Sequence, residues 1–135
     1  MDLSGTWYNQ LNSTMVISVR PDGSLTGSYV SGVGGSAASL LVRQYDPNPG
    51  MSTNVGWVID WRPYSSLTAW SGQAWDDPSG GATIAAMWHL TSETSEANQW
   101  MSTLDGKDVF TRRKKSDEEV AAAMRIIAPS HPHRE

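Results

Sequence analysis

The chain has 135 residues, enough for one domain with a core that can fold alone. Its net charge of −4 and isoelectric point near 5.2 argue against a nucleic-acid partner, which would require a basic surface. The absence of Cys excludes disulfides and thiolate chemistry, and no apolar run approaches the roughly 20 residues that span a bilayer, so we expect no membrane partner either.

The first ten residues already look like folded structure, so we expect no signal peptide in this sequence. A cytoplasmic protein and a secreted protein whose signal has been removed both fit this pattern, and the sequence favours neither.

Tryptophan is unusually frequent, with seven Trp against a single Phe. A core that needed only bulk would use Phe, Leu and Ile, which carry no N–H group to satisfy. Flat indole walls around a ligand are one reading, and a Trp-rich β core is the other. Composition alone leaves both open.

The stretch GTWYNQLNST at residues 5–14 combines aromatic and hydrogen-bonding side chains. We predict a strand here that lines a small-molecule pocket. Asn9 and Ser13 are four residues apart, and Leu11 lies between them, so a strand would place all three on one face.

Alternating apolar runs continue to about residue 113 and are broken by Gly, Pro, Asn and Asp. The triplet Pro21-Asp22-Gly23 predicts a hairpin turn. About eight antiparallel strands with short links indicate a sandwich or an up-and-down barrel, and a barrel of about eight strands can hold one small ligand. In chain order after the first, the expected strands are 14–19, 24–30, 39–45, 54–61, 67–75, 82–90 and 108–113, with a short helical turn within 94–103.

The end of the chain has a different pattern. Residues 112–115 (RRKK) are expected to form a solvent-exposed end of the last strand. Residues 116–127 predict a helix, because Ser116 and Glu119 have capping-box spacing and Pro129 follows. We expect this helix to pack on its own barrel or to fray, with partner binding as the alternative.

Six ordered motifs resemble the avidin/streptavidin family of biotin-binding proteins over about residues 4–113: GTWYNQLNST, LTGSY, GWVIDW, TAWSGQ, WHLTS and EANQWMSTLDGKDVFT. The lack of Cys and the helical tail are most similar to streptavidin and the tamavidins. The resemblance implies an all-β, eight-stranded antiparallel up-and-down barrel over 1–113, followed by a tail over 114–135 with a short helix. It also implies high-affinity sequestration of biotin without catalysis, metal or cofactor.

The resemblance assigns the polar contacts to the ureido ring of biotin. Asn9, Ser13 and Tyr29 match the residues that donate to the ureido oxygen. Ser31 and Asp108 match the acceptors for the two ureido N–H groups, and Asp108 is also expected to hold the Asn9 amide.

The remaining family positions surround the rest of the ligand. Thr68 matches the residue that faces the sulfur, and Ser66 and the backbone N–H of Gly35 match the contacts to the acid chain. The apolar lining matches Leu11, Val33, Leu90, Trp61, Trp70 and Trp88, with Trp100 lent by a neighbouring subunit. This implies a homotetramer, with a dimer as the second possibility.

Two other classes of function remain open from the residues. A Trp-rich carbohydrate-binding module would present exposed indoles on a shallow platform. A hydrolase acting on biotinyl esters would need a base near Ser13 or Ser31, and His89 is the only His in the strand region. His89 is expected to face outward, between the inward-facing Trp88 and Leu90, and no nucleophile–base spacing is present.

Overall fold

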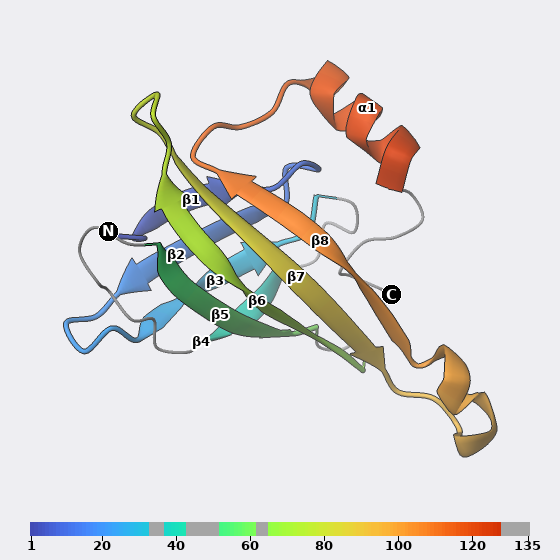
Figure 1. The fold of residues 1–135 in the computed structure, drawn as a ribbon. Helices are drawn as coiled ribbons and strands as arrows, with labels where there is room; N and C mark the ends of the chain where they lie inside the picture. Colours follow the sequence, from blue (N-terminus) through green and yellow to red (C-terminus); the bar gives the residue numbers. More distant parts are fainter. Residues whose placement is uncertain (33–36, 43–51, 62–64, 128–135) are drawn as a thin grey trace.

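The structure is a computed structural model that describes residues 1–32, 37–42, 52–61 and 65–127. Within these residues eight antiparallel strands form a closed barrel in simple chain order (Figure 1). The strands are β1 (Gly5–Tyr8), β2 (Thr14–Val19), β3 (Leu25–Val30), β4 (Ala37–Val42), β5 (Thr53–Asp60), β6 (Ser66–Asp76), β7 (Ala82–Ser92) and β8 (Thr103–Thr111).

Each strand pairs with the next, and β8 returns to β1, so the predicted up-and-down barrel is confirmed. The closing seam is short, because the register of β1 and β8 contains the single pair Tyr8–Thr111. The long strands β6 and β7, of 11 residues each, pair along their whole length. They give the barrel a rigid wall on one side.

The hairpin predicted at Pro21-Asp22-Gly23 is present between β2 and β3. Gly23 has a φ of 85°, a left-handed conformation that glycine adopts without strain. The Asp22 carboxylate accepts the Ser24 N–H at 2.9 Å and so closes the turn.

The last strand begins earlier than predicted, at Thr103 rather than at residue 108. The Asp-Gly-Lys triplet at 105–107 has the composition of a turn but continues the ladder with β7. Gly106 pairs with Trp88, and a Cβ at Gly106 would lie 2.4 Å from the Trp88 ring. The glycine therefore makes room for an indole and does not mark a turn.

Large aromatic side chains fill much of the interior. Trp57 stacks on Trp70 with ring centroids 5.4 Å apart and an interplanar angle of 15°. Phe110 contacts Trp57 edge-on at 5.5 Å. Trp7 is fully buried and donates its indole N–H to the Leu3 carbonyl at 2.9 Å. Trp7 and Trp57 are thus core residues.

Two helical segments lie outside the barrel (Figure 1). The 3-10 helix η1 (Glu96–Met101) extends from the β7–β8 connection, where the sequence predicted a helical turn. Helix α1 (Asp117–Ile127) begins with the predicted cap, because the Ser116 hydroxyl accepts the Glu119 N–H at 3.1 Å. Among the described helices, none has the length and apolar character needed to cross a membrane.

Candidate functional site

The segment from Asn9 to Ser13 is a turn between β1 and β2, so the prediction of a strand here is wrong. The Asn9 side-chain carbonyl accepts the N–H groups of Leu11 and Ser13, each at 2.9 Å. Asn12 takes a left-handed conformation with a φ of 58°, which Asn tolerates better than most residues. These local bonds compete with the ladder and turn the chain. The turn nevertheless buries all three predicted site residues of this segment, Asn9, Leu11 and Ser13. They reach the interior from a turn and not from one face of a strand.

Asp108 on β8 is the centre of a buried polar network. Its carboxylate accepts the Trp70 indole N–H at 2.9 Å, the Gln10 amide at 2.8 Å and the Asn9 amide at 3.4 Å. Burial raises the pKa of Asp108 above its ordinary value of 3.8, while these three donors act in the opposite direction. A carboxylate has about four acceptor positions, so it can still accept a hydrogen bond from a ligand.

Tyr29 on β3 places an unpaired hydroxyl beside this network. The side chain is fully buried, and its hydroxyl has no hydrogen-bond partner within the described part of the chain. Burial raises the pKa of Tyr29 well above its usual value, the negative charge of Asp108 raises it further, and the nearby Ser13 hydroxyl lowers it, although the two hydroxyls do not have hydrogen-bond geometry. The phenol therefore stays protonated and remains a donor.

The Ser13 side chain is bonded to the backbone that follows β3. Its hydroxyl oxygen accepts the Gly32 N–H at 3.0 Å, so the hydroxyl hydrogen is available to a further acceptor. A Cβ at Gly32 would lie 2.1 Å from the Leu11 carbonyl oxygen. Only glycine permits this close approach of the two segments.

Indoles enclose the polar network. Trp61, Trp70 and Trp88 are between 1 and 3% exposed, and Trp61 donates its N–H to the Thr68 hydroxyl at 2.7 Å. Tyr29 packs edge-on against Trp61, with ring centroids 5.6 Å apart. The indole N–H groups of Trp61 and Trp70 are bonded to Thr68 and Asp108, which belong to the same predicted site.

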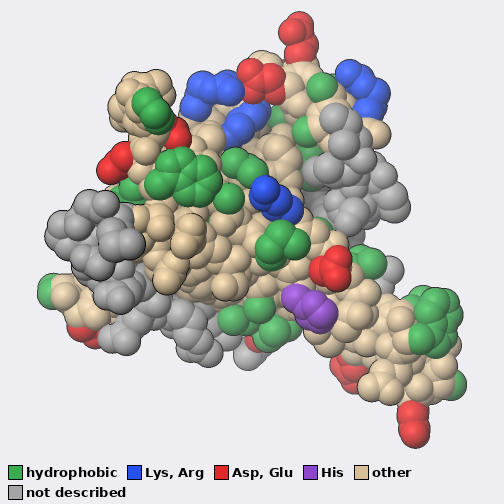
Figure 2. Space-filling view, viewed as in Figure 1, with side chains coloured by type: hydrophobic (Ala, Val, Ile, Leu, Met, Phe, Trp, Pro, Cys, Tyr) green, Lys and Arg blue, Asp and Glu red, His purple; other side chains and the backbone are tan. Residues whose placement is uncertain are grey.

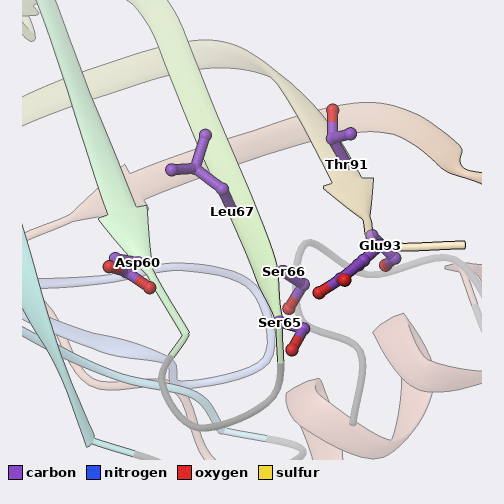
Figure 3. A pocket seen from close by; sticks show the side chains of 7 residues that line it. Asp60, Ser65, Ser66, Leu67, Thr91 and Glu93 are labelled. Carbon is purple, nitrogen blue, oxygen red and sulfur yellow. The ribbon is translucent and has the colours of Figure 1, made fainter.

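The other predicted site residues are buried or lie outside the described residues. Ser31, Ser66 and Leu90 are buried. A hollow of about 500 Å³ opens where β5 and β7 end and β6 begins, and Ser66 lines it (Figure 3). Two carboxylates, Asp60 and Glu93, also line this hollow. Val33 and Gly35 lie outside the described residues.

Trp100 stands apart from the other predicted wall residues. It lies on η1, is 81% exposed, and does not contribute to the enclosure around Tyr29 within its own chain. Such exposure is unusual for an indole, because Trp is highly buried on average.

Comparison with known proteins is decisive, because the profile of the avidin family matches residues 1–113. The chain belongs to the avidin family. It is 29% identical to avidin of Gallus gallus over 123 residues, which cover 86% of this chain and 81% of that protein. It is 28% identical to avidin-related protein 4/5 of Gallus gallus over 115 residues, which cover 82% of this chain and 77% of that protein.

Membership in the avidin family confirms the resemblance read from the sequence. Avidin-family proteins bind a ligand and do not turn it over, so this chain is not an enzyme. His89 is exposed, and the residues described here contain no group of three or more His, Asp and Glu side chains suited to a metal.

The structure adds to this avidin-family site one residue that sequence reasoning missed, Gln10. Its amide nitrogen donates to Asp108 at 2.8 Å, and its amide oxygen accepts the Val109 N–H at 3.2 Å. Gln10 thus continues the short β1–β8 seam with side-chain bonds and holds Asp108 at the same time. No local pattern signals this role, since the two partners are almost 100 residues apart in sequence.

Proposed function

We propose that this avidin-family protein sequesters biotin inside the barrel at high affinity, without catalysis. The observation that carries the proposal is the unpaired Tyr29 hydroxyl, buried near Ser13 and Asp108. A buried donor without a partner costs about 1–3 kcal/mol. A ligand carbonyl that accepts this hydrogen bond removes the penalty.

A cyclic urea has the polar pattern that this cluster needs. Its carbonyl oxygen accepts from Tyr29, from Ser13 and from the Asn9 amide hydrogen that Asp108 does not use. Its N–H groups donate to Asp108 and Ser31. Such bonds are worth more in a dry interior than in water, and the indoles keep water out.

Contacts to the rest of the ligand follow the family roles. We propose that Thr68 faces the sulfur, that Ser66 contacts the acid chain at the rim, and that Leu11, Leu90, Trp61, Trp70 and Trp88 enclose the rings. The low exposure of these side chains supports the assignment. A carbohydrate platform would instead need its stacking indoles at the surface.

We further propose a homotetramer in which Trp100 completes the site of a neighbouring subunit. The outer face of β6–β8 carries exposed apolar side chains, including Leu67 at 42%, Met87 at 58% and Val109 at 38%. Figure 2 shows hydrophobic side chains on this face interspersed with polar and charged ones, and exposed apolar groups on neighbouring strands favour association. A dimer through the same face is the second possibility.

Titration calorimetry with biotin tests the proposed function directly. We expect tight binding with one site per chain, and no heat with simple sugars at the same concentration. Incubation with a biotinyl ester should release no acid at enzyme-like rates. The absence of heat, of quenching of Trp emission and of thermal stabilisation with excess biotin would reject the proposal.

Replacing Tyr29 with phenylalanine should shift stability and affinity in opposite directions. The variant removes an unpaired buried hydroxyl, so the ligand-free protein should unfold at the same or a higher temperature. It also removes one donor to the ureido oxygen, so biotin should dissociate about ten-fold faster. Thermal unfolding and stopped-flow displacement measure the two effects. A large loss of stability in the ligand-free variant would show that the hydroxyl already has a partner.

Biotin binding should weaken in mild acid because Asp108 must be ionised to accept a ureido N–H. The folded pKa is raised above 3.8, so binding should fall as pH decreases through that raised value, before an ordinary Asp would protonate. The stability of the ligand-free protein should change with pH in the opposite direction. Because the folded pKa of Asp108 is raised above 3.8, the contribution of Asp108 to stability is complete below pH 3.8 and is lost as pH rises through the folded pKa. Calorimetry and thermal unfolding across this range check both signs, and Asp108→Asn should flatten both profiles.

A further inference from the structure

The segment that follows β8 returns to the turn that carries Asn9 and Ser13. The Asn12 amide donates to the Lys115 carbonyl oxygen at 2.8 Å, and the Lys115 N–H donates to the Asn12 side-chain oxygen at 2.8 Å. In this reciprocal pair the Asn12 side-chain amide bonds to the Lys115 backbone in the way that two backbone amides pair between strands. It fixes the one residue of the turn that has a left-handed conformation.

The Lys115 ammonium makes a second attachment to the same region. It donates to the Tyr8 carbonyl oxygen at 2.9 Å and to the Thr111 hydroxyl. Tyr8 and Thr111 form the single register pair of the β1–β8 seam, so the ammonium bridges the seam directly before Asn9. The sequence predicts a solvent-exposed segment at residues 112–115, and for Lys115 this prediction is wrong, because its side chain is half-buried.

The charges around Lys115 agree with this position. Burial lowers the pKa of Lys115 to about 8, the Arg113 guanidinium lowers it too, and the Glu119 carboxylate opposes both. Arg113 and Glu119 form an exposed ion pair at 3.1 Å. Glu119 lies in the first turn of α1, where the Ser116 hydroxyl accepts its backbone N–H, and it makes no hydrogen bond with Lys115 among the described contacts.

We propose that Lys115 and Asn12 form a clamp by which the C-terminal segment positions the Asn9–Ser13 turn and so prolongs the residence of the bound ligand. Lys115 and Asn12 are positioning residues in this proposal, since they act through Asn9 and Ser13. Lys115 lies beyond the match to the avidin family, which ends at residue 113. The longer residence of the ligand rests on the proposed function, whereas the positioning of the Asn9–Ser13 turn by the clamp does not.

Asn12→Gly in the full chain is the direct test. Glycine adopts a φ near 58° without strain, so the variant removes the two hydrogen bonds and keeps the backbone shape. In ligand-free protein, the Leu11 and Ser13 amides should exchange with solvent roughly ten-fold faster, while amides of β5 and β6 stay unchanged. Biotin should dissociate roughly ten-fold faster with its association rate within about two-fold of the original.

Lys115→Met tests the second attachment, because it removes the ammonium and keeps the aliphatic stem. Exchange at Leu11 and Ser13 and biotin dissociation should both accelerate. Glu119→Gln is the matched control, since it breaks an exposed ion pair in the same segment and should change neither rate.

The possible results separate the clamp from the proposed function. Unchanged amide exchange in both Asn12→Gly and Lys115→Met overturns the clamp. Faster exchange with unchanged biotin dissociation also overturns it, because the turn would then not govern residence. If the original chain binds no biotin but exchange still responds to Asn12→Gly, the proposed function fails while the hold of the clamp on the turn is supported.

Discussion

Asp108→Ala should weaken biotin binding at least about 100-fold, or about 3 kcal/mol, the largest effect of any single substitution in the site. The substitution removes a charged acceptor for the ureido N–H. It also removes the acceptor shared by Asn9, Gln10 and Trp70. Asn9 then loses the bond that orients its amide toward the ureido oxygen, so both sides of the ligand are affected.

Asp105→Ala is the matched control, because Asp105 lies on the same strand with an exposed side chain. It should leave affinity unchanged. Competition with a labelled biotin analogue measures both variants, and thermal unfolding verifies that Asp108→Ala remains folded. Equal affinities for the two variants would mean that the buried carboxylate does not contact the ligand.

Trp100→Ala should weaken biotin binding by roughly 30-fold and loosen the oligomer in the same variant. The indole is 81% exposed within its own chain, so it cannot enclose that chain's site. If a neighbouring subunit receives it, the same side chain is buried against both protein and ligand. Removal then uncovers the ligand and takes apolar area from the interface.

Trp75→Ala provides the comparison, because Trp75 is also an exposed indole, at 39%, but lies on β6. It has no assigned contact with biotin and should leave dissociation unchanged. Sedimentation velocity gives the assembly state, and stopped-flow displacement gives the dissociation rate. If Trp100→Ala alters neither quantity, the indole is not shared between subunits.

The Lys115–Asn12 clamp and the Asp108 network hold the same turn through different residues. Asn9 reaches Asp108, whereas Asn12 reaches Lys115. Gln10, between them, bonds to β8. A turn fixed at three points loses little further conformational freedom when a ligand binds, and such preorganisation favours slow release.

Local patterns in the sequence determined the strands and the family. Alternation of buried and exposed residues along β5 follows directly from the two-residue period of a strand. The Pro21-Asp22-Gly23 turn and the Ser116 cap likewise act over a few residues, so their chemistry could be read without the fold. The residue types of the site could be aligned with a known family because their order along the chain is preserved.

Tertiary structure alone decided how the two ends of the barrel region meet. Closure of the barrel brings the Asn9–Ser13 turn next to Asp108 and Lys115, which are separated from it by about 100 residues of sequence. Side-chain bonds across such a separation leave no periodic signal, so the turn was mistaken for a strand and Lys115 for a solvent-exposed residue. The buried, unpaired Tyr29 hydroxyl could not be predicted from the sequence either. Its burial and its lack of a partner depend on how the strands close into a barrel, and no single segment determines them.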